Sequence, residues 1–350
     1  MNASAHRAPL AVGLITLASL LTGCNGGAAS PAVPASSFTF TRPNANTGDV
    51  KIWAAAEQTS TLFGLSLGGK RVIKVISTES QPIKGGNPLT LKVHGNALFV
   101  TDVSGGKAGV IQEYKGGHFA RAYSPDCPVS NCSKFTGLLS DAVVDNSHVF
   151  AIMQKIQYQV GENTVSGSGY EYWPNGNPSA MPVAVFLSSD CSAICFYDAG
   201  DEDSSGNLWL RDNGGDGQYG VAEITNPTTS PSMNQGLPLD TFAINAGDIA
   251  GFAISNAGTV LNAGDSSHKI YQYALPVKYG STPFNTLTPC VEGCDPHGFG
   301  FNSTNSLIVV GDGTSRGWLD IGQVSENHWK KVANPQFNVP FSSAVHMPGG

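Results

Sequence analysis

The chain has 350 residues and a net charge of −7, and charged residues make up only 13% of it, whereas it contains 42 glycines and 21 prolines. The acidic balance argues against a nucleic-acid partner, because binding to phosphates needs clustered Lys and Arg side chains. Few charges and many turn-forming residues suit an all-β, exported protein better than a helical one.

The N-terminal segment carries the pattern of an export signal. Arg7 precedes an apolar run over residues 10–21, which is too short to cross a bilayer as a helix but has the length of a signal-peptide core. The run ends in Leu21-Thr22-Gly23-Cys24, which resembles the lipidation box of bacterial lipoproteins. The resemblance implies that residues 1–23 are a signal peptide and that Cys24 becomes the first mature residue, carrying a diacylglycerol and an amide-linked acyl chain such as palmitate. An ordinary secretory signal beside an unrelated cysteine is the alternative.

The lipid would fix the location of the protein. More than one acyl chain anchors a protein stably, so we expect the folded part to lie outside the cytoplasm, attached to the cell envelope through the membrane. Asn25, rather than Asp, follows the cysteine, which would favour the outer membrane in a Gram-negative cell. Residues 24–37 are small, polar and proline-containing and should form a flexible tether to a domain over residues 38–350.

A segment of one kind recurs through this domain at intervals of about fifty residues. Each copy has a short apolar stretch, a polar turn with Asn, Asp or Gly, and an apolar strand, and a third alternating strand usually follows. The first large apolar residues of the copies lie 46 to 59 residues apart: Ile52, Leu98, Val149, Leu208, Val260 and Leu307. Repeats of this length, each with about four short strands, are typical of a β-propeller.

The six copies predict an all-β fold, a six-bladed β-propeller. Residues 342–349 have the pattern of a blade's first strand and turn that do not continue, and residues 49–53 have that of a second strand without its first. We therefore expect the N- and C-terminal strands to join and close the ring. A count of seven blades stays open if residues 38–41 and the long step from Val149 to Leu208 conceal a further blade.

Two segments point to a family. Asp295-Pro296-His297-Gly298-Phe299-Gly300-Phe301-Asn302 and Gly206-Asn207-Leu208-Trp209-Leu210 resemble the blade openings of the NHL-repeat and SMP-30/gluconolactonase-like propellers. The resemblance covers most of residues 49–350 as an architecture, and its short motifs mark a blade turn more than a function. It implies a divalent metal held by one Glu, Asn residues and an Asp. This chain departs from that pattern, because no Glu occupies a clear first-blade equivalent.

The first strand of each blade should line the central channel, and its leading end should face the mouth. The candidate ligand-binding side chains there are Asn87, Asp141, Asp201 or Asp203, Asp248, His297 and Ser343. Asp and His side chains can hold a divalent metal or move a proton. The alternative is that they cap turns and meet water. The segment Asp201-Glu202-Asp203-Ser204-Ser205-Gly206 is likewise either a cation-binding loop or, as we favour, a hairpin turn.

The remaining cysteines form three close pairs: Cys127 and Cys132, Cys191 and Cys195, and Cys290 and Cys294. An exported protein meets an oxidising compartment, so we expect three local disulfides. Zinc binding would require two pairs to come together, and no His follows at the spacing of a zinc finger. Each pair precedes a blade's first strand, so the bridges would hold loops on one face of the ring, either for binding or as protection against proteolysis.

Three functions fit this pattern. The first is a lipid-anchored binding module for a protein, a glycan or a small molecule at the disulfide-bearing face. The second is a metal-dependent hydrolase or lactonase of the SMP-30-like kind, with a divalent cofactor near Asp141, Asp248 and His297. The third is a structural component of an envelope assembly.

Overall fold

A computed structural model describes residues 50–56, 59–106, 108–188, 197–213, 219–229, 240–243, 249–265, 267–278, 280–289, 296–312, 318–332 and 341–347. The chain divides into two compact units, Met1–Arg42 and Pro43–Gly350. All described residues belong to the second unit, so the expected signal peptide, Cys24 and the tether lie outside them. The described part contains strands and no helix, and accordingly no helix of the length and hydropathy needed to span a membrane.

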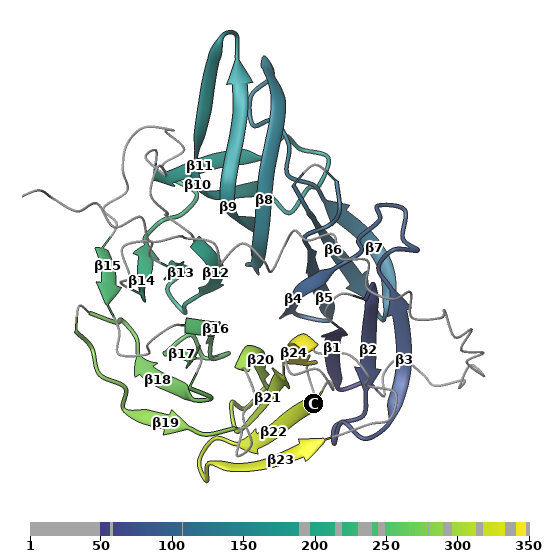
Figure 1. Ribbon diagram of the computed structural model, residues 1–350, viewed down its shortest axis with the longest axis vertical. Coiled ribbons are helices and arrows are strands. Elements are labelled where there is room, and N and C mark those ends of the chain that lie inside the picture. The colour runs from purple at the N-terminus through teal and green to yellow at the C-terminus, as the bar shows by residue number, and fades with distance from the viewer. Residues whose placement is uncertain are drawn as a thin grey trace, which may run out of the picture. The chain divides into compact units, whose positions relative to one another are not determined.

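The described residues form twenty-four β-strands in six four-stranded antiparallel sheets, the blades (Figure 1). Blade 1 holds β24 (Phe341–His346), β1 (Ile52–Ala56), β2 (Thr61–Leu65) and β3 (Val72–Ser77); blade 2 holds β4 (Pro88–His94), β5 (Ala97–Asp102), β6 (Val110–Lys115) and β7 (His118–Tyr123); blade 3 holds β8 (Cys132–Val144), β9 (His148–Val160), β10 (Asn163–Pro174) and β11 (Val183–Ser188); blade 4 holds β12 (Tyr197–Glu202), β13 (Leu208–Asn213), β14 (Tyr219–Ile224) and β15 (Asp240–Ala243); blade 5 holds β16 (Ile249–Ile254), β17 (Val260–Asp265), β18 (Ile270–Ala274) and β19 (Asn285–Leu287); blade 6 holds β20 (Pro296–Phe301), β21 (Leu307–Asp312), β22 (Trp318–Gln323) and β23 (His328–Val332).

The core lies between the blades. Because side chains alternate along a strand, Trp53 and Ala55 of β1 pack toward blade 2, whereas Ile52 and Ala54 pack toward blade 6. The described residues form six such apolar clusters, one at each junction between neighbouring blades. A single four-stranded sheet could not cover both of its faces, and the ring covers all of them.

The ring closes as the sequence predicts. β24 pairs antiparallel with β1, with Ala344 opposite Ala54 and His346 opposite Ile52, so the C-terminal strand supplies the innermost strand of blade 1. At the neighbouring junction β20 lies so close to β24 that a Cβ atom at Gly298 would be 2.5 Å from Ser343 Oγ. This contact explains the alternation of glycine with phenylalanine in β20.

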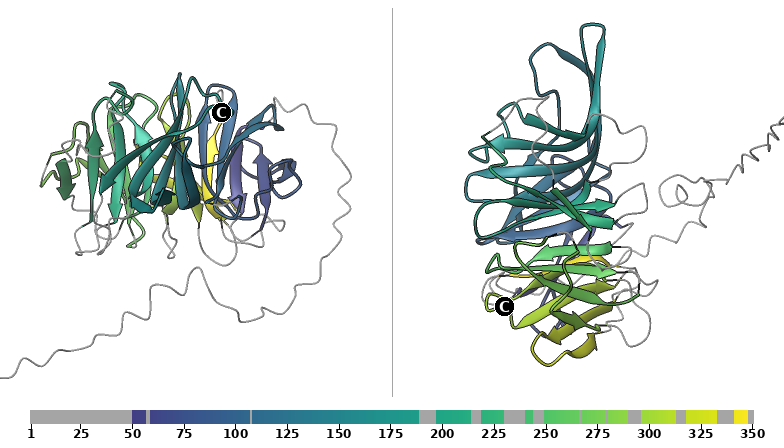
Figure 2. Two further views of the ribbon diagram at one scale, coloured as in Figure 1. Left: turned by 90° about the horizontal axis from the view of Figure 1, so that it is seen from above. Right: turned by 90° about the vertical axis from the view of Figure 1, so that its left-hand side faces the viewer.

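The described residues form a closed ring of six blades, so no seventh blade lies between Val149 and Leu208, and residues 38–41 lie outside the described residues. The long step between Val149 and Leu208 comes from blade 3, where β8 and β9 each have 13 residues and β10 has 12. Their outer parts, residues 132–138, 155–160 and 163–167, form a three-stranded extension, here called the blade-3 arm. Figures 1 and 2 show the arm pointing away from the centre of the ring, while the strands of the blades run across the ring's thickness.

All six inner strands carry an irregularity at the same place. The inner strand of each blade is β24, β4, β8, β12, β16 or β20. Its pairing register with the second strand shifts by one residue where the inner strand enters the channel, as at Pro88/Thr90, Leu139/Asp141 and Pro296/Gly298. The extra residues at these β-bulges are Leu89, Ser140, Asp198, Ala250, His297 and Ser342. A bulge re-aims the side chains that follow it, so the six strands can be aligned residue by residue along the channel.

Candidate functional site

Aligned residues of the inner strands meet at the same level in the channel. Thr90 Oγ1 of β4 donates a hydrogen bond to Asp141 Oδ1 of β8 at 2.6 Å, and both are the first residue after the bulge. The inner strands therefore all run in one direction. The channel has an entry end, where the inner strands begin, and a turn end, where they turn back into the second strands.

Lys92 crosses the middle of this channel. Its Nζ atom lies 3.6 Å from Asp141 Oδ2, 3.6 Å from Asp201 Oδ2 and 2.7 Å from the carbonyl oxygen of Gly200, to which it donates. These partners come from blades 3 and 4, while Lys92 belongs to blade 2. Asp201 Oδ2 also accepts from the backbone N–H of Ile254 at 2.8 Å, so the network joins four blades.

The charges in this network are compensated. Burial alone would lower the pKa of Lys92, but the carboxylates of Asp141 and Asp201 outweigh burial and leave that pKa raised. Asp141, whose side chain is only 2% exposed, also accepts from the N–H groups of Gly200 and Ala142 at 3.0 and 2.8 Å. Its oxygens are thus occupied by protein donors, which argues against a role as a metal ligand.

The other predicted channel residues do not gather at one mouth. Asn87 precedes β4 at the entry end, where its N–H donates to Asp102 Oδ1 at 3.0 Å, and Ser343 lines the channel near that end. Asp203 follows β12 and therefore lies at the turn end, so placing it with Asn87 is wrong. The physical reason is that both residues flank an inner strand, but on opposite sides of it.

The side chains of two of the proposed hydrolase residues lie outside the described part of the structure. Asp248 lies outside the described residues, and His297 is the bulge residue of β20, of which only the backbone is described. Among the described residues, no group of three or more His, Cys, Asp and Glu side chains is arranged to hold a metal ion.

Asp203 is the cap of the hairpin turn between β12 and β13. Its carboxylate accepts from the N–H groups of Ser205 at 2.8 Å and Asn207 at 3.0 Å, and from Trp209 Nε1 at 2.9 Å. Gly206 in this turn has φ of 79°, a backbone conformation that suits glycine. The segment from Asp201 to Gly206 thus forms a turn stabilised by its own aspartate, as favoured above, rather than a cation loop.

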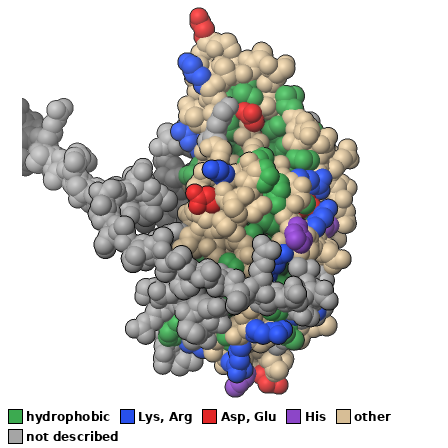
Figure 3. All heavy atoms as spheres, turned by 90° about the vertical axis from the view of Figure 1, so that its right-hand side faces the viewer, with side chains coloured by type: hydrophobic (Ala, Val, Ile, Leu, Met, Phe, Trp, Pro, Cys, Tyr) green, Lys and Arg blue, Asp and Glu red, His purple; other side chains and the backbone are tan. Residues whose placement is uncertain are grey.

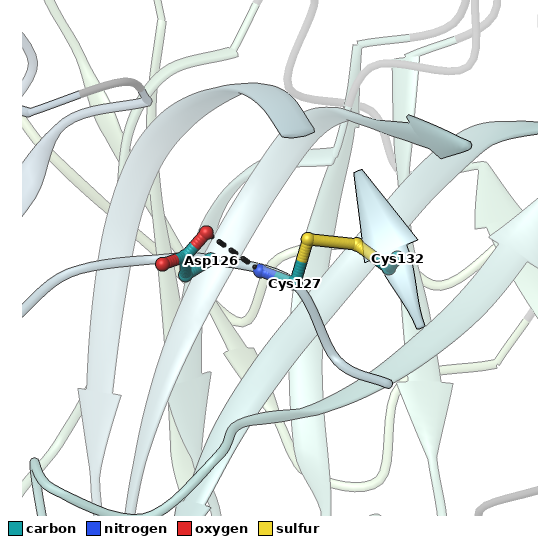
Figure 4. The surroundings of a disulfide bond; sticks show 3 residues. All are labelled: Asp126, Cys127 and Cys132. Atoms are coloured by element: carbon teal, nitrogen blue, oxygen red, sulfur yellow. Dashed lines mark hydrogen bonds between the residues drawn. A yellow bond between two sulfur atoms is a disulfide. The ribbon is translucent and has the colours of Figure 1, made fainter. Parts of the chain in front are cut away.

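One predicted cysteine pair is present in the described residues. Cys127 and Cys132 form a disulfide with an S–S distance of 2.00 Å, and Asp126 Oδ1 accepts from the Cys127 N–H at 2.9 Å (Figure 4). Cys132 lies opposite Val160, beside the turn that joins β9 and β10. This bridge therefore holds the far end of the blade-3 arm, rather than a loop at the channel. Cys191, Cys195, Cys290 and Cys294 lie outside the described residues.

A cavity of about 320 Å³ opens at the turn end of the channel. Lys92 and Asp201 lie at the inner limit of this cavity. Lys92 also lines a second cavity, on the entry side of the channel, and so separates the two. Apolar side chains from all blades except blade 4 line the first cavity: Leu91, Val93, Val144, Ala253, Ile254, Phe299, Phe301 and Val345. We call this space the turn-end cavity.

Two polar side chains of the turn-end cavity lack protein partners that would satisfy them. His346, the last residue of β24, is 4% exposed, and neither ring nitrogen has a hydrogen-bond partner. Burial lowers its pKa to about 4, so the ring is neutral at pH 7. Glu202, the last residue of β12, has its pKa raised to about 7 by burial and then by the charges of Asp145, Asp201 and Asp203.

A second cavity of about 320 Å³ lies on the entry side, and its polar groups have partners. Arg211 forms an ion pair with Asp198. Ser140 Oγ donates to the carbonyl oxygen of Ile152 at 3.0 Å, and Ser342 Oγ donates to that of Pro88 at 2.8 Å. These bonds use the polar atoms to join blades, so the entry side offers less unsatisfied hydrogen-bonding capacity than the turn end.

On the face that Figure 3 displays, hydrophobic side chains form a run through the upper and central part of the described surface. Lys and Arg side chains are scattered there among Asp, Glu, His and uncharged polar groups over its described part. The most exposed large apolar side chains of the described residues, Phe284 and Met181, belong to different blades. The channel is therefore the better candidate for a specific site.

Comparison with known proteins supports the architecture. No protein-family model matches the chain, and no curated protein matches it. Among solved structures, a chain of a nidogen/laminin complex has a TM-score of 0.52 at 11% identity, over 85% of this chain and 98% of that one. The WD40 repeats of RRP9 give a TM-score of 0.46 at 16% identity over 86% and 81%, and U3-55K gives 0.45 at 15% over 87% and 80%. At these identities the likeness to the nidogen/laminin chain shows the fold alone, a six-bladed β-propeller. Membership of the NHL-repeat or SMP-30-like families gains no support.

Sequence reasoning missed two side chains of the turn-end cavity, Lys92 and His346, and it named Glu202 only as part of a possible cation-binding loop. A signal was available in the sequence. Aligning the C-terminal strand with the other inner strands puts His346 at the same level as Glu202, Phe301 and Val93. In this alignment His346 and Glu202 are the polar residues at a position that is otherwise apolar, which marks them as candidate site residues.

Proposed function

We propose that this protein is a lipid-anchored binding module of the cell envelope that holds a small molecule in the turn-end cavity. The six-bladed propeller is a fold consistent with an interaction module. The observation that carries the proposal is His346, a residue of the cavity wall whose two ring nitrogens are buried and have no hydrogen-bond partner. Leaving a buried polar group unpaired costs free energy, and a ligand that pairs with it recovers that free energy.

Binding is favoured over hydrolysis by the state of the channel carboxylates. The hydrolase hypothesis needs Asp141 as a free ligand or base, yet this residue is bound by Lys92, Thr90 and Gly200. Removing it from this network would leave Lys92 as a buried cation with one partner fewer, which is costly. A binding site at the turn end needs no such rearrangement.

The lipid anchor is supported by the lipidation box at Cys24 and the short polar tether that follows it. The test is expression of the full chain in a bacterium, membrane fractionation and mass spectrometry of the N-terminal peptide. We expect an acylated Cys24 in the membrane fraction, and release of a Cys24→Ser variant from it. An unmodified Cys24 on a protein released without the substitution would overturn the anchor.

The binding site is tested with the full chain in detergent and a chemically diverse fragment set. Ala257 is an exposed turn residue that lines the turn-end cavity, so Ala257→Trp should fill the cavity from its rim. Ser303→Trp is the matched control, because Ser303 is exposed on the equivalent turn of blade 6 and does not line the cavity. We expect fragments whose binding is lost only in Ala257→Trp. If no fragment behaves in this way, the cavity is not the site.

A further inference from the structure

We propose that the ligand of the turn-end cavity is a small organic cation, with an ammonium group held at Glu202, an apolar body and a hydroxyl group held at His346. This inference rests on the proposed function and names the chemical class of its ligand. Four features of the cavity lead to it: its excess of negative charge, the placement of the two polar side chains that lack protein partners, its apolar walls and its size.

The charge of the cavity favours a cation. Asp201, Glu202 and Asp203 line it, and Lys92 is the cationic side chain among its lining residues. Lys92 is already shared between Asp201 and Asp141, so it does not offset Glu202 or Asp203. A cleft lined by charges of one sign attracts ligands of the opposite sign.

Glu202 is the member of this group with the fewest protein donors. Asp203 is occupied by its own turn, and Asp145, on the turn between β8 and β9, accepts from the N–H groups of Ser147 and His148 and pairs with the His148 ring. The residues that follow β16 and line the cavity, Ser255, Asn256 and Ala257, carry no charge. An ammonium group beside Glu202 would relieve the repulsion among these carboxylates.

His346 requires a different kind of group. As a neutral imidazole it offers one N–H donor and one acceptor nitrogen, which matches a hydroxyl group better than a charged one. It stands on blade 1, and Glu202 stands on blade 4, on the opposite side of the ring (Figure 1). The two polar groups of the ligand should therefore lie at opposite ends of it.

The walls between these two residues are apolar and the space is small. Val93, Val144, Ile254 and Phe301 occupy the same level of the other four inner strands. The cavity volume of about 320 Å³ is near the lower limit of ligand pockets, which span roughly 300–1,000 Å³. A body the size of one aromatic ring with a short chain meets both conditions.

The test measures three probes against the full chain by calorimetry. Tyramine has the ammonium group, the ring and the hydroxyl; phenethylamine lacks the hydroxyl, and 4-ethylphenol lacks the ammonium group. We expect tyramine to bind about tenfold or more tightly than either truncated probe. Ala257→Trp should abolish the binding of all three, which separates the cavity from partition into detergent, and Ser303→Trp should leave it unchanged.

Two variants assign the groups. Glu202→Gln should weaken tyramine about tenfold and leave 4-ethylphenol unchanged. His346→Leu, which removes both the donor and the acceptor of the ring, should weaken tyramine and leave phenethylamine unchanged. Another outcome is that neutral or anionic fragments bind to the unmodified chain and not to Ala257→Trp, while tyramine does not bind at all. In that case the ligand class is wrong and the proposed function stands. If nothing binds that Ala257→Trp blocks, the proposed function itself fails. Equal loss of all probes in Glu202→Gln would also overturn the assignment.

Discussion

Lys92 of blade 2 and Asp141 of the neighbouring blade 3 form an ion pair in the central channel, with Nζ and Oδ2 3.6 Å apart. The residues are 49 positions apart in the chain, and the ring brings them together because the inner strands of neighbouring blades run side by side. The pair does two things. It joins two blades that belong to different β-sheets. It also divides the channel into an entry side, whose polar groups have hydrogen-bond partners, and a turn-end cavity, where His346 and Glu202 lack them.

Replacing Lys92 by methionine should destabilise the protein by about 3 kcal/mol, because it leaves a buried aspartate without its cation. Urea unfolding at pH 7 measures the change. Lys155→Met is the control, since Lys155 is exposed on the blade-3 arm and its loss should change the free energy of unfolding by no more than about 0.5 kcal/mol. The double variant Lys92→Met, Asp141→Asn should recover part of the loss. Equal effects of Lys92→Met and Lys155→Met would show that the pair does not hold the blades.

The closing strand gives a second prediction. Ala344 is fully buried in β24 opposite Ala54, so Ala344→Asp would bury a carboxylate between blades 1 and 6. We expect a loss of about 3 kcal/mol or more, measured as a lowered urea midpoint or as insoluble expression. The control is Ala120→Asp, at an exposed position on the outermost strand of blade 2. Similar stability of the two variants would mean that β24 does not close the ring.

Much of the fold could be predicted from the sequence because a blade leaves a local pattern. Turn residues and alternating strands identify the copies, and the incomplete first and last copies indicate the closure. The blade-3 arm could not be predicted, because β9 and β10 continue the same alternation beyond the ring and nothing local marks where the blade ends. The lengthened spacing was a sign of it, but an inserted blade would lengthen the spacing in the same way.

The site was less predictable, since it depends on which end of a strand a residue occupies. Asn87 and Asp203 both flank an inner strand, and only the strand direction shows that they lie at opposite ends of the channel. Asp141 has the residue type of a metal ligand, and its partner Lys92 can be found only from the alignment of neighbouring blades. The local sequence shows that a residue has the chemical type of a ligand. Whether its polar atoms already have protein partners depends on which residues the neighbouring blades place beside it.

The disulfide between Cys127 and Cys132 should act locally. It closes a loop with a sequence separation of five, so its removal in Cys127→Ser, Cys132→Ser should cost no more than about 2 kcal/mol. Because the bridge lies at the far end of the arm, we expect faster amide exchange in the arm and unchanged exchange in β12, β16 and β20. Faster exchange throughout the ring would show that the arm and the blades unfold together.

His346 and Glu202 of the turn-end cavity should shift stability with pH in opposite directions. The pKa of His346 is lowered to about 4, so between pH 6.5 and pH 4 the folded state binds fewer protons than the unfolded state, and acidification removes stability. Over this range the loss is about 3 kcal/mol. The pKa of Glu202 is raised to about 7, so the folded state takes up the extra proton between pH 7 and pH 4.5, and acidification adds stability there.

Single variants separate the two effects, and each serves as the control for the other. Relative to the unmodified chain, His346→Gln should gain stability as the pH falls from 7.5 to 4.5, because it removes the group that must be kept neutral. Glu202→Gln should lose relative stability over the same range, because it removes the group whose protonation favours the folded state. The measurement is the free energy of unfolding in urea at pH 7.5, 5.5 and 4.5, taken as the difference from the unmodified chain so that the titration of other groups cancels. If the free energy of unfolding of His346→Gln, relative to the unmodified chain, does not change with pH, the His346 ring is already protonated or already hydrogen-bonded in the folded protein.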